Sequence, residues 1–402
     1  MNASRSRRPD DAAQLATLLD VTRQLMTVTD LGVLLRHIAE ATTAMADAER
    51  ATIYIVDPDR DEYWSTVALG AEGGEIRFPL GVGIAGTVAQ TGETINIAEP
   101  YADLRFNPEN DQRTGFRTRS LLTLPMAGHD GRIIGVFQAV NKRTGPFTAE
   151  DEATLGALAA SAAIAVENAQ LVSGQKQLWR SLLETLARTI DARDQQTAGH
   201  SARVARYAGV IGRGMGLAAP ALEALEAAAL LHDYGKIAVR DRFLQKPGRL
   251  DEAEFAYMKA HAEKTAEFLA YLDFPSQLRD VPTIAGQHHE RMDGAGYPHG
   301  LRAAAIVPGA RIVAAADVFD ALTAPRYYKP AYPLATTLEM MDRMAGDHLD
   351  PAVMAAVHAC LPELAACIEE LRDTWPKPGE EGMGTIQEAA GRLAERDRAR
   401  PE

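Results

Sequence analysis

Histidine and aspartate side chains concentrate in one part of the sequence, where their types and spacing suit metal binding. Six of the ten histidines lie between residues 200 and 299. His232 and Asp233 are adjacent at the end of the apolar stretch ALEALEAAALL, and His288 and His289 open the stretch HHERMDGAGYPHG. Imidazole and carboxylate groups in combination are common ligands of divalent ions in enzymes. A single histidine is more often structural, so the prediction of a metal site depends on the whole set.

The number of candidate ligands favours two ions over one. His200 and His261 add imidazoles, and Asp317 and Asp320 add carboxylates within the apolar stretch ARIVAAADVFDAL, where each needs a buried partner. Five histidines together with Asp233 and Asp317 are too many for one tetrahedral site, so we expect two ions that share Asp233. The absence of cysteine ligands favours iron or manganese over a structural zinc. Two such ions suit the in-line displacement of phosphodiester hydrolysis.

Predicted helices carry these candidate ligands. From Asp151 to about residue 373, apolar residues recur at helical spacing and strand patterns largely disappear. His232 comes where an apolar helix ends. His261 lies within a helix that Asp251 opens, with Glu254 at the capping-box position three residues later, so its ring can be held rigidly.

The first half of the chain has the pattern of an α+β domain. Helical spacing from Ala13 to Met45 gives way to ATIYIVD and YWSTVAL around the turn PDRDE, then SLLTLPMA and IIGVFQAVN around the turn GHDG. These patterns predict an antiparallel sheet. A nearly continuous helix over 152–194 is expected to follow, with an apolar stripe at Leu178, Leu182, Leu183, Leu186 and Ile190. The stripe predicts pairing with a second copy of the chain, although packing within one chain would give the same pattern.

Composition and charge exclude several classes of protein. With 402 residues and 46% hydrophobic content, the chain can form two or three folded domains. A formal net charge of −13 argues against binding nucleic acid. Cys360 and Cys367 suit neither a disulfide framework nor a CxxC metal site. We recognise no secretion signal and no apolar stretch long enough to cross a membrane, so we expect a cytoplasmic protein without membrane insertion.

Five motifs in the second half resemble the HD-GYP domain, a branch of the HD phosphohydrolases, in the order of that family. They are TAGHSARVARYA, LLHDYGKI, LQKPGRLDEAEFAYMKAH, HHERMDGAGYPHGL and ADVFDALTAPRYYKP. The resemblance implies an all-α bundle that hydrolyses the bacterial messenger cyclic di-GMP to pGpG, GMP or both. It assigns two groups of metal ligands with a bridging aspartate: His200, His232, Asp233 and Asp317 for one ion, and His261, His288, His289 and Asp233 for the other.

The same resemblance implies roles for residues beyond the ligands. Lys236 would contact the scissile phosphate and the attacking hydroxide, while Tyr297, Arg326 and Lys329 would hold the dinucleotide. Some relatives bind a third metal with a glutamate where Gln196 stands here, so two ions are expected.

The stretch from 288 to 300 contains further polar residues with a different expected role. Glu290, Arg291 and Asp293 are expected to fix the turn by hydrogen bonds, and His299 is expected to bind no metal. The glycines of this stretch would let the backbone turn so that Tyr297 faces the substrate.

The first half resembles GAF domains, in particular those of cyclic-nucleotide phosphodiesterases and cyclases. The signature of nucleotide-binding members matches Asn141, Lys142, Phe147, Asp151 and Glu152, and the fuller match adds Asp111, Thr114 and Thr118. Lys142 and Asp151 are expected to pair across the end of a strand and the start of a helix. The resemblance implies a site for cAMP or cGMP; the alternative is a turn and helix cap that bind nothing.

These inferences define a multidomain chain. We expect a disordered segment over 1–13, a GAF sensory domain over 14–170, a connecting helix over 171–194, an HD-GYP catalytic domain over 195–372 and a charged tail over 373–402. The leading function is a homodimeric phosphodiesterase with two metal ions, regulated by a small ligand at the GAF domain. The alternatives are an HD phosphohydrolase acting on another cyclic dinucleotide or nucleotide, and a non-catalytic nucleotide-sensing scaffold.

Overall fold

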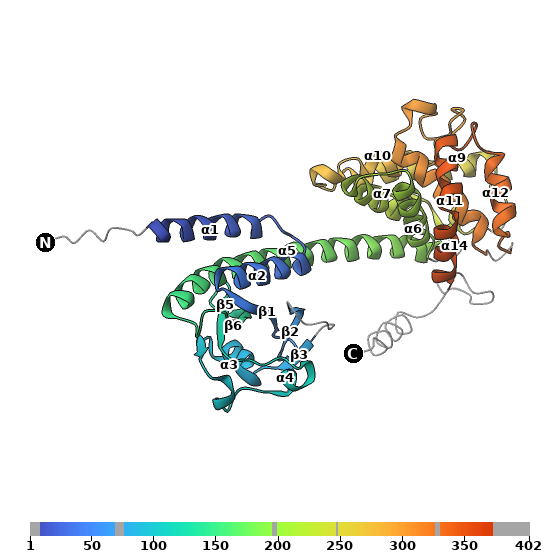
Figure 1. Cartoon of the computed structure of the whole chain (residues 1–402). Helices are drawn as coiled ribbons and strands as arrows, with labels where there is room; N and C mark the ends of the chain where they lie inside the picture. The colour runs from blue at the N-terminus through green and yellow to red at the C-terminus, as the bar shows by residue number, and fades with distance from the viewer. Residues whose placement is uncertain (1–8, 69–75, 195–198, 247, 326–329, 373–402) are drawn as a thin grey trace. The chain divides into compact units, whose positions relative to one another are not determined.

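The computed structural model describes residues 9–68, 76–194, 199–246, 248–325 and 330–372 (Figure 1). The chain divides into two compact units, Met1–Leu178 and Trp179–Glu402, which are considered separately below. Helix α5 (Ala149–Arg193) begins in the first unit and ends in the second. This arrangement confirms the expected fold class: an α+β unit with an antiparallel sheet, a long helix and a helical second unit.

A six-stranded antiparallel sheet forms the centre of the first unit. Its strands are β1 (Ala48–Asp57), β2 (Glu62–Ala68), β3 (Ile76–Pro79), β4 (Ile95–Ile97), β5 (Leu121–Ala127) and β6 (Ile133–Lys142), in the order β3-β2-β1-β6-β5-β4. The pairs β1 with β2 and β5 with β6 are the two antiparallel pairs predicted from the turns between them. Central strands β1 and β6 pair with Ile53 opposite Phe137, and both side chains are fully buried.

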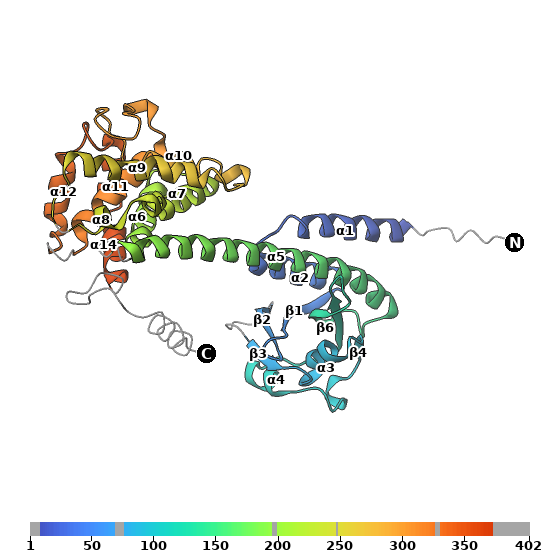
Figure 2. The same cartoon turned by 180° about the vertical axis from the view of Figure 1, so that it is seen from behind.

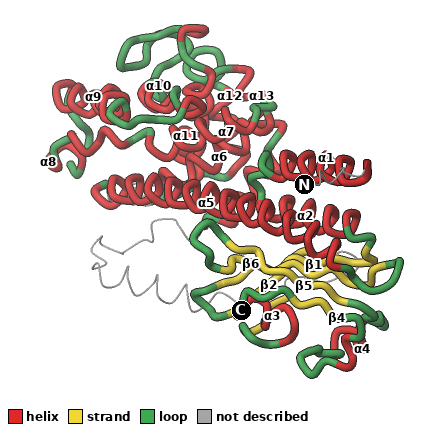
Figure 3. The backbone as a smooth tube through the Cα atoms, turned by 90° about the vertical axis from the view of Figure 1, so that its left-hand side faces the viewer, coloured by secondary structure: helices red, strands yellow, loops and turns green. Residues whose placement is uncertain are grey.

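Helices cover both faces of this sheet (Figure 3). On one face, α2 (Leu31–Met45) and α5 pack over a core that includes Leu35, Phe137 and Leu158. On the other face lie α3 (Gly83–Thr91) and a smaller core around Tyr63 and Val136. The remaining helices of this unit are α1 (Pro9–Leu25), the short η1 (Pro100–Ala102) and α4 (Glu109–Thr114).

The predicted helical region before the sheet contains two helices, α1 and α2. Helix α1 begins at Pro9, inside the segment expected to be disordered, and proline is compatible with the first helical turn. Asp30 caps α2, because its Oδ1 accepts a hydrogen bond from the amide of Val33 at 2.9 Å.

In the second unit, every helix or strand assigned among the described residues is a helix, as predicted, and one isolated β-bridge joins Ala345 to Leu349 (Figure 2). Its helices are α6 (His200–Gly214), α7 (Ala219–Leu231), η2 (Tyr234–Ala238), α8 (Asp241–Leu244), α9 (Glu252–Leu269), η3 (Ser276–Leu278), α10 (Val281–Gly286), η4 (Ala303–Ala305), α11 (Pro308–Thr323), α12 (Leu334–Asp342), α13 (Pro351–Ala359) and α14 (Leu361–Glu370). Helices α6, α7, α10 and α11 contribute to one core that includes Tyr207, Leu225 and Phe319. The predicted tail over 373–402 lies outside the described residues.

The apolar stripe predicted near the end of α5 is divided between two environments. Leu183 and Ile190 are buried in the core of the second unit. Leu178 and Leu182 are 61% and 50% exposed, so they do not belong to that core. Packing within one chain therefore accounts for only part of the stripe.

Helix α5 is also apolar enough to meet a length and composition test for a membrane span. Its best window has a mean hydropathy of 1.4, and the bent pair α13 and α14 passes the same test together. Leu155, Leu158, Ala162 and Val166 of α5 are buried in the core of the first unit, which accounts for much of this apolar composition.

Candidate metal centre

The second unit brings all seven predicted metal ligands together from separate helices. His200 begins α6, His232 and Asp233 link α7 to η2, and His261 lies in α9. The other three are His288 and His289, directly after α10, and Asp317, within α11. Their ligand atoms form three groups, within each of which all atoms lie within 4.8 Å of one another: His200, His232 and Asp317; His261, His288 and His289; and His232, Asp233 and His288.

Asp233 lies between the first two groups. Its Oδ2 is 3.4 Å from His232 Nε2 and 3.9 Å from His200 Nε2. Its Oδ1 instead faces the other group, at 3.3 Å from His261 Nε2. One carboxylate therefore directs each oxygen to a different set of imidazoles, as expected of a bridging ligand.

Hydrogen bonds at Nδ1 orient three of the buried imidazoles. The Nδ1 atoms of His232, His261 and His288 lie 2.7, 2.6 and 2.6 Å from the backbone oxygens of Ala229, Met258 and Ala285. A carbonyl can only accept, so each Nδ1 carries a proton, and in the neutral ring Nε2 keeps its lone pair. The Nε2 atoms of His261 and His288 lie 3.4 Å apart, so the two rings present these nitrogens to the same space.

His200 has a carboxylate partner instead of a carbonyl. Its Nδ1 donates to Asp320 Oδ2 at 2.7 Å, and Arg203 donates to both oxygens of Asp320 at 2.6 and 3.1 Å. Arg203 and Asp320 are each 1% exposed. The sequence predicted that Asp320 needs a partner but missed Arg203, whose position three residues after His200 on an otherwise buried helical face was the available signal.

Lys236 is the cation nearest the bridging carboxylate among the described contacts. Its Nζ lies 2.7 Å from Asp233 Oδ2 and 3.2 Å from Asp194 Oδ2. Burial alone would lower the pKa of Lys236, but Asp233 and Asp194 outweigh it and raise that pKa. The ammonium therefore stays charged beside the centre. Asp194 is a further residue that the sequence analysis did not single out.

Without a metal ion, the two ligand groups differ in protonation. Burial and the neighbouring imidazoles hold the pKa of His288 well below its usual range and lower that of His289 to about 3, so both are neutral at pH 7. Burial opposes protonation of His200 as well, but Asp317 and Asp320 outweigh it and raise its pKa to about 10. A dication at His200 and Asp317 would take the place of this proton.

These observations fit a pair of bound divalent ions. The second group offers the nitrogens of neutral His288 and His289, and the first offers His200, His232 and Asp317, where a dication would replace the proton of His200; neither group contains sulfur. Without a cation, the carboxylates of buried Asp233 and half-buried Asp317 lie among five imidazoles, of which those of His200, His232, His261 and His288 are buried. The donor set suits iron, manganese and similar ions.

The loop after His289 is fixed by the acidic residues assigned to it from sequence. Glu290 accepts the amides of His299 and Leu301 at 2.7 and 2.8 Å. Arg291 and Asp293 form a salt bridge of 2.5 Å. The turn predictions are thus confirmed, and the exposed His299 contributes its amide to the turn.

Tyr297 lies beside the second ligand group. Its ring centroid is 4.7 Å from that of His289, and Lys259 Nζ lies 5.6 Å from the Tyr297 ring. Gly296 permits a close approach before it, since a Cβ there would come within 2.4 Å of the amide nitrogen of Arg291. The other predicted substrate contacts, Arg326 and Lys329, lie outside the described residues, as does Gln196.

Thr265 contributes a structural contact to the centre. Its hydroxyl donates to the backbone oxygen of His232 at 2.9 Å and accepts from the amide of Gly235 at 2.8 Å. A Cβ at Gly235 would come within 2.0 Å of the backbone oxygen of His261. This contact ties α9 to the turn that carries the adjacent histidine and aspartate.

In the first unit, the predicted ligand-binding residues bond to one another and to the backbone. Asp111 accepts from the amide and hydroxyl of Thr118 at 2.7 and 2.9 Å. Asn141 is fully buried at a positive φ of 57°, and its side chain bonds to the amide of Arg119 at 2.6 Å and the carbonyl of Arg117 at 2.9 Å. The side chain of Thr114 lies outside the described residues.

The expected pair at the end of β6 is present. Lys142 Nζ lies 2.5 Å from Asp151 Oδ2, which also accepts from the amide of Thr148 at 2.7 Å. Glu152 Oε1 accepts from Asn96 at 2.7 Å, and the same amide group donates to the backbone oxygen of buried Phe147 at 3.1 Å. These contacts join β6, β4 and the first turn of α5.

Comparisons with known proteins agree with this division. A model of the HD domain matches residues 184–353, and a model of the GAF domain matches residues 30–166. The 3'3'-cGAMP-specific phosphodiesterase 3 of Vibrio cholerae is 39% identical over 180 residues, which cover 45% of this chain and 38% of that protein.

Two further relatives show similar partial matches. The cyclic di-GMP phosphodiesterase response regulator RpfG of Xanthomonas campestris is 42% identical over 181 residues, covering 44% of this chain and 47% of that protein. The dual 3',5'-cyclic-AMP and -GMP phosphodiesterase 11A of Takifugu rubripes is 35% identical over 184 residues, covering 42% of this chain and 20% of that protein. The chain thus spans less than half the length of each of these relatives.

Proposed function

We propose that this chain, which matches models of the GAF domain and the HD domain, is a metal-dependent phosphodiesterase that hydrolyses cyclic di-GMP. The observation that carries this proposal is the geometry of Asp233, whose two oxygens face two separate groups of imidazoles. Such a site suits two ions that act on one phosphate. The names of relatives as cyclic dinucleotide phosphodiesterases support the substrate class.

Each residue near the centre has a distinct part in the proposed reaction. Bound divalent ions of this kind supply Lewis acidity and an activated water for phosphoryl transfer. Lys236 holds a positive charge beside Asp233 and would donate hydrogen bonds to the phosphate as negative charge develops. Tyr297 offers a ring face for a base at the edge of the second group.

The net reaction follows from the balance of atoms. One P–O ester bond of the cyclic dinucleotide breaks, water adds its oxygen to phosphorus, and a proton goes to the departing ribose oxygen. The product of the first cleavage is linear pGpG, and the same chemistry on the remaining diester would give GMP. We propose that Arg326 and Lys329 contribute cations to phosphate or guanine binding.

We propose two ions per chain, iron or manganese, one for each ligand group. Imidazole and carboxylate donors without thiolates suit these borderline ions. The absence of sulfur ligands, combined with seven donors, argues against one structural zinc.

A second substrate has specific support. Several relatives, including the one from Vibrio cholerae described above, are named as specific for 3'3'-cGAMP. This dinucleotide shares the phosphodiester chemistry of cyclic di-GMP and differs in one base. A panel of both cyclic dinucleotides, with pGpG as a third substrate, would rank the candidates.

The direct test is hydrolysis of cyclic di-GMP by full-length protein loaded with iron or manganese, followed by chromatography of the products. We expect linear pGpG, with or without GMP, and no turnover by the H232A variant. Identical behaviour of the wild type and H232A would contradict the proposal, because His232 belongs to the first ligand group.

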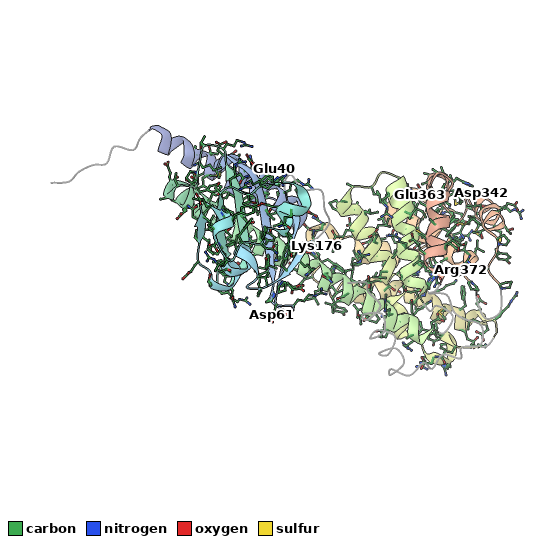
Figure 4. The ribbon with its side chains drawn as sticks, turned by 60° about the horizontal axis from the view of Figure 1, so that its bottom comes forward. Glu40, Asp61, Lys176, Asp342, Glu363 and Arg372 are labelled. Carbon is green, nitrogen blue, oxygen red and sulfur yellow. The ribbon has the colours of Figure 1, made fainter. Side chains whose placement is uncertain are left out.

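We propose that the chain is a homodimer through α5. Ile164, Leu171 and Leu178 are 49%, 65% and 61% exposed and recur every seven residues, and Leu182 continues the stripe at 50% exposure. Such spacing favours pairing of two helices along one seam. The labelled Lys176 lies on the same helix, among exposed polar residues (Figure 4). Substituting Leu171 and Leu178 by lysine should yield a monomer in light scattering at the same protein concentration.

We propose that the GAF domain binds a small regulatory ligand, with cAMP and cGMP as the first candidates. The match to the nucleotide-binding signature supports this idea. The hydrogen bonds between Asp111 and Thr118, and those from Asn141 to the backbone of Arg119 and Arg117, favour a structural role for those three side chains. Equal rates of hydrolysis with and without saturating cAMP or cGMP would contradict regulation by these ligands. We propose that the protein acts in the bacterial cytoplasm.

A further inference from the structure

The end of helix α5 contacts the side chain of Lys236. Asp194, the residue after the last one of α5, lies with its Oδ2 3.2 Å from Lys236 Nζ. The Asp194 side chain is 10% exposed, so water does little to screen this pair. Because Asp233 lies 2.7 Å from the same ammonium, two carboxylates on opposite elements fix its position.

The last residue of α5 contacts the backbone on both sides of this lysine's turn. The Arg193 guanidinium donates to the carbonyl oxygens of Ile237 and Val239 at 2.8 and 3.2 Å, and to that of Lys236 at 3.4 Å. It also bonds to Asp241 at 2.6 Å. A guanidinium presents its donors in a rigid fork, so these contacts hold the whole η2 segment at a fixed distance from the helix end.

The same helical turn also holds the start of α6. Asp191 accepts the hydroxyl of Ser201 at 2.7 Å and its amide at 3.3 Å. Ser201 directly follows the metal-ligand candidate His200. Asp191 and Asp194 are three residues apart and therefore share one side of the helix. One turn of α5 thus contacts two of the segments that carry the candidate centre.

We propose that Arg193 and Asp194 are positioning residues for Lys236, so that the position of the last turn of α5 sets where this ammonium lies relative to Asp233. The catalytic meaning of this inference rests on the proposed function. Asp194 acts on the side chain and Arg193 on the segment that carries it. Neither residue belongs to the three ligand groups, so their loss should alter turnover without removing metal.

The first experiment replaces Asp194 by asparagine in the full-length, metal-loaded protein. D194N keeps the shape of the side chain but removes its charge, and we expect kcat for cyclic di-GMP to fall about ten-fold. KM and the number of metal ions per chain should stay at their wild-type values. The matched control is E184Q. Glu184 lies on the same helix, pairs with Arg180 and is 43% exposed, so this variant should keep wild-type kcat.

A double-mutant cycle separates positioning from general structural support. K236M removes the ammonium, so adding D194N to K236M should produce no further loss of kcat. A ten-fold loss from D194N in both backgrounds would overturn the proposal, because Asp194 would then act independently of Lys236. Loss of metal from D194N would overturn it as well.

Hydrogen exchange tests the inference without any substrate. In R193M, the amides of residues 234–239 should exchange at least several-fold faster, while those of α13 (Pro351–Ala359) keep wild-type rates. Unchanged exchange over 234–239 would overturn the positioning role of Arg193. If the wild type hydrolysed no cyclic dinucleotide, the proposed function would fail, and the exchange rates would still decide this inference.

Discussion

Two polar clusters in this chain, one in each unit, differ in whether their polar atoms are already paired by hydrogen bonds within the protein. In the second unit, called the HD unit below as the first is called the GAF unit, the imidazoles of His232 and His261 bond through Nδ1 to backbone carbonyl oxygens. Their Nε2 atoms face the oxygens of Asp233. In the GAF unit, Asp111 accepts from the hydroxyl of Thr118, and Asn141 bonds to the backbone of Arg119 and Arg117. The first arrangement directs ligand atoms towards a shared space, whereas in the second the polar atoms are already paired by hydrogen bonds within the protein.

The difference shows what a motif can and cannot indicate. A side chain whose donors and acceptors are already paired must break those bonds before it binds a ligand. The GAF signature is therefore compatible with a structural role for Asn141, whose left-handed backbone conformation and four hydrogen bonds close the region around β6. The HD cluster instead contains the neutral imidazoles of His288 and His289, whose nitrogens a dication would satisfy.

The largest expected effect comes from removing the bridging charge. D233N should lower hydrolysis of cyclic di-GMP at least about a hundred-fold, because an amide group replaces one of the two carboxylate oxygens, the negative charge between the ligand groups is lost, and Lys236 loses an ionic partner. Metal content should fall below that of the wild type in elemental analysis. The matched control is H299N, a change to an exposed histidine in the same loop, which should retain both metal and activity.

Next in size is the effect of the carboxylate behind His200. D320N should weaken metal binding about ten- to hundred-fold, measured by competition with a chelator, because Asp320 orients His200 and is itself held by Arg203. D342N provides the control: Asp342 pairs with His358 near the surface, at 49% and 45% exposure (Figure 4). Equal metal affinity of D320N and the wild type would refute the orienting role.

Metal removal should lower the stability of the second unit and leave that of the first unit unchanged. A metal ion that binds only the folded state, present at a free concentration of about one hundred times its dissociation constant, stabilises that state by about 2.7 kcal/mol. Chelation should therefore speed hydrogen exchange of amides in α7 and α9, which carry ligands, while the sheet strands β1 and β6 keep their rates. Equal acceleration in the sheet would show that the metal centre is not confined to the HD unit.

These effects separate what could be predicted from the sequence and what could not. The seven ligand candidates were predictable because histidine and aspartate stand out within apolar helices and their chemistry has few alternatives. Arg203 was missed because a single arginine in an amphipathic helix usually lies at the surface, and only the packing of α6 against α11 buries it beside Asp320. The division of the α5 stripe likewise depends on tertiary packing, since Leu182 and Leu183 are adjacent but only Leu183 is buried.

The smallest expected effect is in the GAF unit. K142M should reduce the free energy of unfolding of this unit by about 1 to 2 kcal/mol, because the half-buried Asp151 loses its cation while retaining the bonds from Thr148. Denaturant titration followed by the fluorescence of Trp64, which packs against the GAF core, measures this change. Metal content should be unaffected. A loss of cyclic-nucleotide binding without a loss of stability would instead assign Lys142 to a ligand site and remove the contrast between the two clusters.

The most direct test of the central claim is elemental analysis of the purified wild-type protein and of two variants, H200A and H289A. It gives the number of metal ions per chain, and hydrolysis of cyclic di-GMP is followed on the same samples. The account predicts two ions in the wild type, fewer in each variant because each removes a ligand of a different group, and pGpG formation by the wild type alone. A wild type without bound metal after loading, or variants that retain two ions and full activity, would contradict it.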